Sequence, residues 1–117
     1  MDATEIKSRL TTILINLPTA YSIASARKLM SSFENYKHIA QSLPTNTSLA
    51  KSGVRAAFDP IESDIRFAII GTPKKEAESR WLNAKEQMTK GINSLLAVPE
   101  KDLERDAGGA AAGGGDA

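Results

Sequence analysis

The chain has 117 residues, of which 41% are hydrophobic and 25% are charged, and its formal net charge is +1. These values are typical of one soluble globular domain with a modest core. The absence of cysteine excludes disulfides, thiolate metal sites and cysteine nucleophiles, and no apolar run approaches the roughly 20 residues that span a bilayer.

The first predicted helix covers residues 4–17. Its apolar side chains recur at helical spacing and form one stripe, made by Ile6, Leu10, Ile13, Leu14 and Leu17. Asp2 or Thr4 is the expected N-cap, and Pro18 ends the helix. The start of the chain, Met1 to Glu5, is acidic and polar, so we expect either no targeting peptide or a mature form with an added start methionine.

The second predicted helix covers residues 19–43. Thr19, which follows Pro18, is its expected N-cap, and Pro44 stops it because the residue before a proline is pushed out of the helical region. The spacing alternates between three and four residues, as in the seam of a bundle helix. The predicted seam consists of Ile23, Ala26, Met30, Phe33, Tyr36 or Lys37, Ala40 and Leu43.

The third predicted helix starts near Thr47 or Ser48 and runs to Ile70, with Gly71 as its C-terminal cap. Its core face consists of Phe58, Ile61, Ile65 and Ala68. Asp59 and Pro60 also read as a fresh helix start, with Asp59 as N-cap, Pro60 at the first helical position and Glu62 three residues after the cap. We therefore expect a kink or a break at Asp59. Glu62 and Arg66 are four residues apart, in the order that favours an ion pair.

The fourth predicted helix covers residues 73–98, with Thr72 as cap and Pro73 at the first position. Its seam consists of Ala77, Trp81, Ala84, Met88, Gly91 or Ile92, and Leu95. A short turn over residues 100–105 is expected to pack Leu103 on the bundle. Residues 106–117 are rich in glycine and alanine, so the predicted organisation is a helical domain over residues 1–105 and a flexible tail over residues 106–117.

These helices predict an all-α fold, an up-down-up-down four-helix bundle. The second, third and fourth helices have similar predicted lengths, of about 22 to 26 residues. They are joined by short, polar loops that contain proline, which favours antiparallel neighbours. The first helix is about half as long, so one end of the bundle should be covered by fewer helices.

The residue types that can carry chemistry have simpler structural explanations in this chain. His38 is the single histidine, near the end of a helix, where its charge would favour the helix dipole. Asp59, Glu62 and Asp64 are acidic but lack the glycine-containing loop typical of calcium sites. Trp81 lies on a helical seam and is interpreted as core. We therefore expect neither an enzyme nor a metal site nor a cofactor.

Basic residues dominate the first half of the chain. Seven basic residues face Glu34 alone between Ile6 and Phe58, whereas the tail from Glu100 onward is net acidic. The candidate partner-binding residues are Arg27, Lys28, Lys51, Arg55, Lys74 and Lys75. Lys74 and Lys75 open a helix, where cations oppose the helix dipole, which indicates that they serve a partner. Solvated faces of amphipathic helices are an equally good explanation of this pattern.

The third helix also resembles a known family. The run from Val54 to Arg66, together with the Lys74-Lys75-Glu76 opening of the next helix, is similar to the extrinsic lumenal proteins of photosystem II. The resemblance is to the PsbQ group and to the small extrinsic bundle protein of diatoms. It implies a protein of the chloroplast thylakoid lumen, peripheral to the membrane. Such a protein would bind acidic lumenal surfaces of photosystem II and help retain ions at the manganese cluster without ligating metal itself.

Two other interpretations remain open. The first is a basic bundle that binds nucleic acid, although such domains usually have a pI above about 9 or a recognisable motif, and this chain has a pI of about 8.0. The second is a helical adaptor or chaperone, which should expose an apolar groove where the short first helix leaves the bundle uncovered.

Overall fold

The computed structural model describes residues 2–43 and 57–104 of the chain. Within these ranges the chain forms helices and no strand, so the predicted all-α class is confirmed. The helices are α1 (Ala3–Ile15), α2 (Ile23–Gln41), α4 (Phe58–Ile70), α5 (Lys74–Leu96) and α6 (Glu100–Glu104). The first part of the predicted third helix and the predicted tail over residues 106–117 lie outside the described residues.

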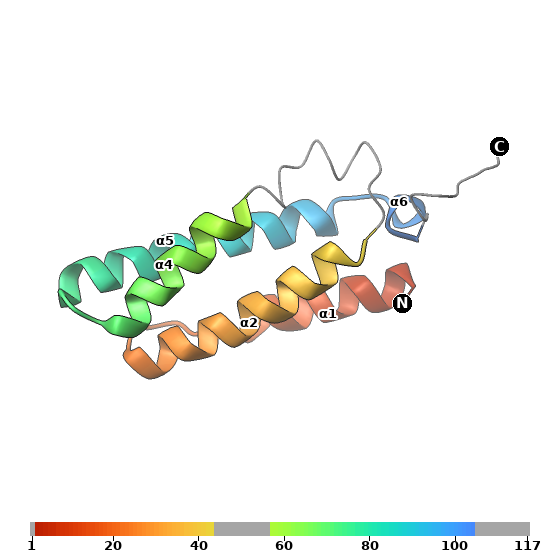
Figure 1. Cartoon of the computed structure of the whole chain (residues 1–117). Helices are drawn as coiled ribbons and strands as arrows, with labels where there is room; N and C mark the ends of the chain where they lie inside the picture. The colour runs from red at the N-terminus through yellow and green to blue at the C-terminus, as the bar shows by residue number, and fades with distance from the viewer. Residues whose placement is uncertain (1, 44–56, 105–117) are drawn as a thin grey trace.

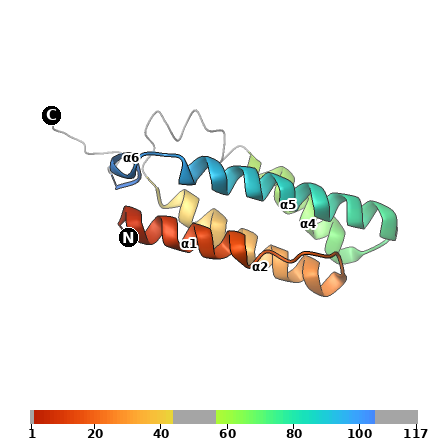
Figure 2. The ribbon, with the colours of Figure 1, turned by 180° about the vertical axis from the view of Figure 1, so that it is seen from behind.

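The four longer helices lie side by side along one axis, and consecutive helices run in opposite directions (Figure 1). Seen from behind, α1 lies against α2 and α5 and ends well short of the end at which α2 begins (Figure 2). The segment between α1 and α2 covers this remaining length. Its Leu17 is buried, and its Tyr21 packs edge-on against Trp81 of α5 with ring centroids 5.9 Å apart.

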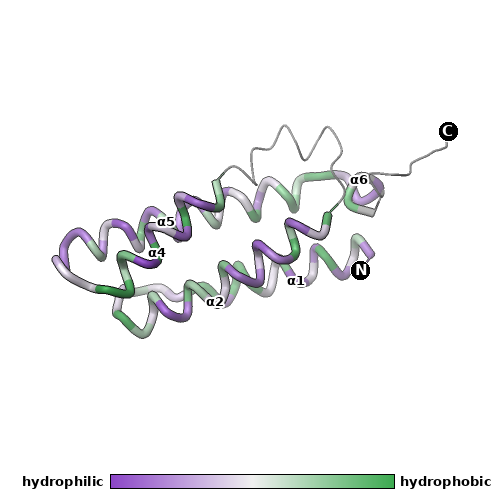
Figure 3. The backbone as a smooth tube through the Cα atoms, in the orientation of Figure 1, coloured by the Kyte–Doolittle hydropathy of each residue, from purple (hydrophilic) through white to green (hydrophobic). Residues whose placement is uncertain are grey.

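The core is built from the inward faces of the helices, and hydrophobic and hydrophilic residues alternate along each helix (Figure 3). All the predicted core residues of α4 are buried, and so are Trp81 and Leu103. At the start of α4, Phe58 meets Phe33 and Tyr36 of α2 edge-to-face, with ring centroids 6.1 Å and 5.6 Å apart. Such aromatic pairs add specific geometry to the burial of apolar area.

The predicted seam of α2 is correct in most positions and wrong in two. Ala26, Phe33, Tyr36 and Ala40 are buried, but Leu29 is fully buried in place of the half-buried Met30. Ile23 is 45% exposed, because it is the first residue of α2 and lies at the end of the bundle. Helical periodicity determines which face of a helix is apolar, but it does not indicate where neighbouring helices stop.

The helix starts agree with the prediction for α1 and differ from it for α2, α4 and α5. Asp2 caps α1, and its side chain accepts a hydrogen bond from the Glu5 amide at 2.8 Å. α2 is capped by Ser22, not by Thr19, through a hydrogen bond from the Ser25 amide to the Ser22 hydroxyl at 2.9 Å. The helix starts late because residues 16–21 are used to cross from the end of α1 to the end of the bundle.

α5 starts one residue later than predicted, with Pro73 rather than Thr72 at the N-cap and no side-chain cap. Gly71 ends α4 as predicted, with a φ of 79° that favours glycine. Of the helices expected to have about 22 to 26 residues, α5 agrees with 23 residues, whereas α2 is shorter with 19. α4 has 13 residues, counted from Phe58.

The predicted junction at Asp59 and Pro60 forms the beginning of α4. The helix begins at Phe58 with Ala57 at the N-cap, so Asp59 is not the cap and Pro60 is the third helical residue. Proline is tolerated there because the first N–H groups of a helix have no intrahelical partner. The chain before Ala57 lies outside the described residues. The predicted kink or break at Asp59 is therefore not tested by the structure.

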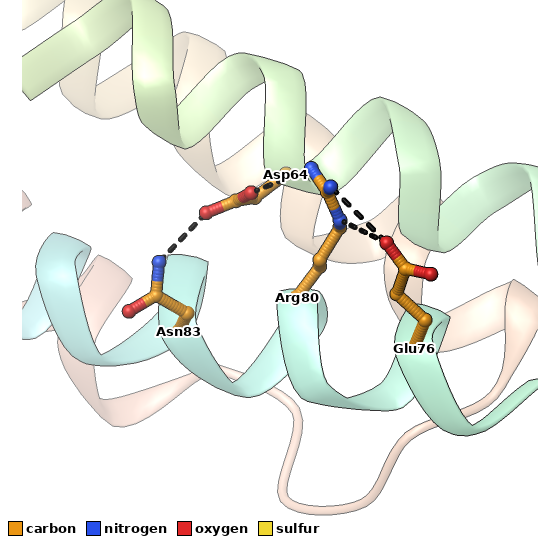
Figure 4. A network of polar contacts seen from close by, with 4 residues as sticks. All are labelled: Asp64, Glu76, Arg80 and Asn83. Atoms are coloured by element: carbon orange, nitrogen blue, oxygen red, sulfur yellow. Dashed lines mark hydrogen bonds and ion pairs between the residues drawn. The ribbon is translucent and has the colours of Figure 1, made fainter.

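A polar network joins α4 to α5 on their outer side (Figure 4). Asp64 accepts hydrogen bonds from Asn83 at 2.7 Å and from Arg80 at 3.4 Å. Arg80 is held by Glu76 at 3.1 Å, and its guanidinium lies 4.5 Å from the centre of the Phe67 ring. The network adds polar contacts between α4 and α5 to the packing of their buried faces. No helix among the described residues combines the length and the apolar character needed to cross a bilayer.

Candidate docking surface at the basic end of the bundle

Four of the candidate basic residues lie at the same end of the molecule. α2 and α5 begin there, and α4 ends there (Figure 1). Two contacts hold these segments together: the Tyr21 hydroxyl donates to the Ala68 carbonyl at 2.8 Å, and the Ile23 side chain lies against Gly71. We call this the basic end and define it by its cations, which are Arg27, Lys28, Lys74 and Lys75.

All four cations of the basic end are exposed, and none of them forms an ion pair within the described part of the chain. By contrast, Arg9, Arg66, Arg80 and Lys90 each pair with a carboxylate four residues earlier in the same helix. The charges of the basic end are therefore available to a partner. Lys7, Lys85 and Lys101 also lack a carboxylate partner among the described residues, but they are spread over α1, α5 and α6.

Helix dipoles strengthen the positive potential of the basic end. The N-termini of both α2 and α5 lie there, and a helix N-terminus carries about half a positive charge. α2 has no acidic residue in its first turn. In α5, Glu76 forms an ion pair with Arg80 at 3.1 Å. The other acid in the first two turns of α5 is Glu78, which forms no ion pair with the described residues. Lys74 and Lys75 occupy the first turn, where their charges oppose the dipole.

Lys51 and Arg55 were also predicted to bind the partner, and both lie outside the described residues. The structure therefore brings together four of the six predicted cations. The sequence contained no direct signal for this grouping, because the Arg27-Lys28 and Lys74-Lys75 pairs are far apart in the chain. They lie at the same end only because α2 and α5 run in the same direction, with α4 antiparallel to both (Figure 1).

Glu62 and Arg66 at the junction form the predicted ion pair, and Arg66 Nε donates to Glu62 Oε2 at 3.0 Å. The structure adds a partner that the sequence analysis missed, since Lys37 Nζ of α2 lies 3.5 Å from Glu62 Oε1. The Arg66 hydrogen bond is the main cause that lowers the pKa of Glu62, and the charge of Lys37 adds to it. Glu62 thus links α2 to α4. Asp59 and Pro60 are exposed in the first turn of α4.

His38 is exposed in the last turn of α2, where its position agrees with the expected interaction with the helix dipole. It lines an open groove of about 310 Å³ between α1 and α2, whose other polar walls are Ser8, Arg9, Thr12 and Asn35. Arg9 in this groove is already paired with Glu5 at 2.8 Å. The charge that the groove offers to a ligand is therefore largely compensated.

The acids Asp59, Glu62 and Asp64 are close in the sequence but have different surroundings. Asp59 is exposed, Glu62 forms ion pairs with Arg66 and Lys37, and Asp64 accepts hydrogen bonds from Arg80 and Asn83. Among the described residues, no three histidine, aspartate or glutamate side chains come together in a way that would hold a metal ion. Glu62 and Asp64 are thus engaged within the fold, unlike the four cations of the basic end, which form no ion pair in the described part of the chain.

No protein-family model, no curated protein and no solved structure matches this chain. The assignment of a function to the basic end therefore rests on its geometry and charge, together with the resemblance described above.

Proposed function

We propose that this protein is a non-enzymatic docking subunit that binds an acidic protein surface through the basic end. The observation that carries the proposal is the gathering of Arg27, Lys28, Lys74 and Lys75, all exposed and without ion pairs in the described structure, at one end of the molecule. Complementary charge accelerates association and fixes orientation more than it raises affinity, which suits a subunit that docks reversibly.

The specific form of the proposal is an extrinsic subunit of photosystem II. In this form, the protein lies in the thylakoid lumen, peripheral to the membrane, and supports oxygen evolution by helping to retain ions at the manganese cluster. Support comes from the similarity of residues 54–66 and 74–76 to the PsbQ group. Lys51 and Arg55, which lie outside the described residues, remain candidate partner-binding residues and are not assigned to the basic end. We also propose the up-down-up-down four-helix topology, which the alternating directions of α1, α2, α4 and α5 support (Figure 1).

Co-sedimentation with salt-washed photosystem II membranes across a sodium chloride series tests the proposal, with oxygen evolution measured in parallel. We expect saturable binding that weakens with salt and restores activity. The charge-reversed variant R27E/K28E/K74E/K75E should lose this binding. The control K7E/K101E reverses two charges rather than four and should retain it, because these cations of α1 and α6 lie away from the basic end.

Three results would change the proposal. If the wild type does not bind at low salt, the photosystem assignment is wrong. If both the charge-reversed variant and its control bind like wild type, the basic end is not the docking surface, and K51E/R55E becomes the variant to compare. If the protein instead binds a duplex DNA fragment with a steep dependence on salt, the partner is nucleic acid.

A further inference from the structure

Two exposed isoleucines lie at the basic end. Large hydrophobic side chains are exposed at four positions among the described residues: Ile15, Ile23, Ile70 and Leu82. Ile23 is the first residue of α2 and Ile70 the last residue of α4, with 45% and 69% of their surfaces exposed. Ile23 lies against Gly71, which directly follows Ile70. The two isoleucines therefore flank the same turn, although the chain separates them by more than forty residues.

The surrounding residues of this turn are basic. Arg27 and Lys28 follow Ile23 by about one turn of α2, and Lys74 and Lys75 follow Ile70 by four and five residues. An apolar centre with a charged rim is the usual arrangement of a specific protein interface, in which a few central side chains dominate the binding energy. A purely electrostatic surface has no need of exposed isoleucines next to its cations in the helices.

We infer that Ile23 and Ile70 form the apolar anchor of the docking surface, and that its occupant is a protein with an apolar contact set in an acidic surface. This inference rests on the proposed function and adds to it the chemistry of the partner. Charge complementarity selects the occupant: the cations on both sides of the isoleucines require acidic groups around the apolar contact.

Two other occupants fit the surface less well. A second copy of this chain, related by a two-fold axis through the isoleucines, would bring the four cations of each copy together, which disfavours association. A lipid surface usually binds the long apolar face of an amphipathic helix. Here the apolar side chains come from the ends of two different helices, and the buried faces of both helices are occupied by the core.

Two polymers separate the contribution of charge from that of the apolar anchor. Poly-L-glutamate offers acidic groups alone, and a random copolymer of glutamate and tyrosine offers acidic groups with apolar side chains. Binding of the full chain to each polymer is measured by titration calorimetry at low salt. We expect the wild type to bind the copolymer at least about tenfold more tightly than polyglutamate, the ratio expected when a central apolar contact is gained.

The variant I23S/I70S should lose this preference and bind the two polymers within about twofold of each other. I15S is the matched control: Ile15 is 75% exposed but ends α1, short of the basic end, so the preference should persist. All three substituted positions are exposed, and circular dichroism checks that each variant is folded. R27E/K28E/K74E/K75E should bind neither polymer.

The outcomes separate the inference from the proposed function. If I23S/I70S keeps the preference, or the wild type shows none, the apolar anchor is wrong while electrostatic docking stands. If the wild type binds neither polymer, electrostatic docking on acidic protein is wrong as well. Isoleucine-dependent binding to phosphatidylglycerol vesicles without any preference for the copolymer would identify a lipid partner. An isoleucine-dependent dimer in sedimentation velocity would identify a second copy; either result overturns the inference.

Discussion

The Tyr36 side chain of α2 packs directly on Gly91 of α5. A Cβ atom at residue 91 would overlap the Tyr36 hydroxyl and would lie 3.0 Å from Cζ of the ring. Tyr36 is fully buried, and its ring also meets Phe33 and Phe58 edge-to-face. Glycine at residue 91 is thus required by the close approach of an aromatic ring from the neighbouring helix.

The substitution G91A is expected to lower the free energy of unfolding by about 1–3 kcal/mol, the usual range for overpacking a core. This loss should exceed the gain of roughly 1 kcal/mol that alanine brings over glycine in a helix interior. Urea unfolding of wild type and G91A measures the net change in the free energy of unfolding. In a Y36F background, G91A should cost clearly less, because the overlapping hydroxyl is gone; equal costs in the two backgrounds would show that Tyr36 does not make the contact.

The Tyr36 hydroxyl is buried and has no hydrogen-bond partner among the described residues. Y36F should therefore leave stability at neutral pH unchanged or raise it by up to about 1 kcal/mol, since a buried hydroxyl without a partner is unfavourable. Urea unfolding at neutral pH is the measurement. A loss of more than about 1 kcal/mol would indicate a hydrogen bond that the structure does not contain.

Burial also raises the pKa of Tyr36 in the folded state. Between the ordinary tyrosine pKa of about 10 and the raised value, the folded chain holds a proton that the unfolded chain loses. This contribution to stability is present below pH 10 and is lost as the pH rises above it. The free energy of unfolding of wild type and Y36F is compared at pH 8 and at about pH 11. It should fall less in Y36F than in wild type between these two pH values.

Glu62 makes the opposite contribution at acid pH. Its pKa is lowered, chiefly by the hydrogen bond from Arg66, so below the ordinary value of 4.5 the unfolded chain binds a proton that the folded chain does not. The stabilisation is complete above that pH and is lost as the pH falls through the lowered pKa. In urea unfolding between pH 6 and pH 3, the free energy of unfolding should fall less steeply with falling pH for E62Q than for wild type. R66Q should show a similarly reduced dependence on pH. The wild-type pH dependence in both variants would contradict this assignment.

Lys74 and Lys75 are expected to serve binding at the expense of stability. Both lie in the first turn of α5, so K74E/K75E replaces unfavourable charges by favourable ones and should raise the free energy of unfolding by a few tenths to about 1 kcal/mol. The same variant should bind acidic partners less tightly. R27E/K28E is the control for stability, because these residues lie in the second turn of α2, where the dipole effect is weaker. A destabilised K74E/K75E would indicate a structural role instead.

The apolar faces of the helices could be read from the sequence because they depend on local periodicity. The spacing of Phe58, Ile61, Ile65 and Ala68 predicted the buried face of α4, and the spacing from Ala77 to Leu95 predicted that of α5. The ion pair of Glu62 with Arg66 was also predictable, because residues four apart are neighbours on a helix.

The helix starts were less predictable, because several residues in each loop can cap a helix. Thr19 and Ser22 are both suitable N-caps, and the distance from the end of α1 to the end of the bundle selects Ser22. The exposure of Ile23 has the same origin. Its spacing matches the seam, but Ile23 is the first residue of α2 and α1 ends well short of it, so the turn at Gly71 covers its side chain only in part (Figure 2).

The sequence by itself determined that the chain is helical, which face of each described helix is buried and which residues carry charge, since each of these depends on residue type and on a spacing of a few residues. Only the tertiary structure decided that Arg27 and Lys28 lie at the same end as Lys74 and Lys75, that Lys37 reaches Glu62, and that Tyr36 meets Gly91. These relationships join residues far apart in the chain. They depend on the direction and register of whole helices, which are set by loop lengths and by close packing of the core.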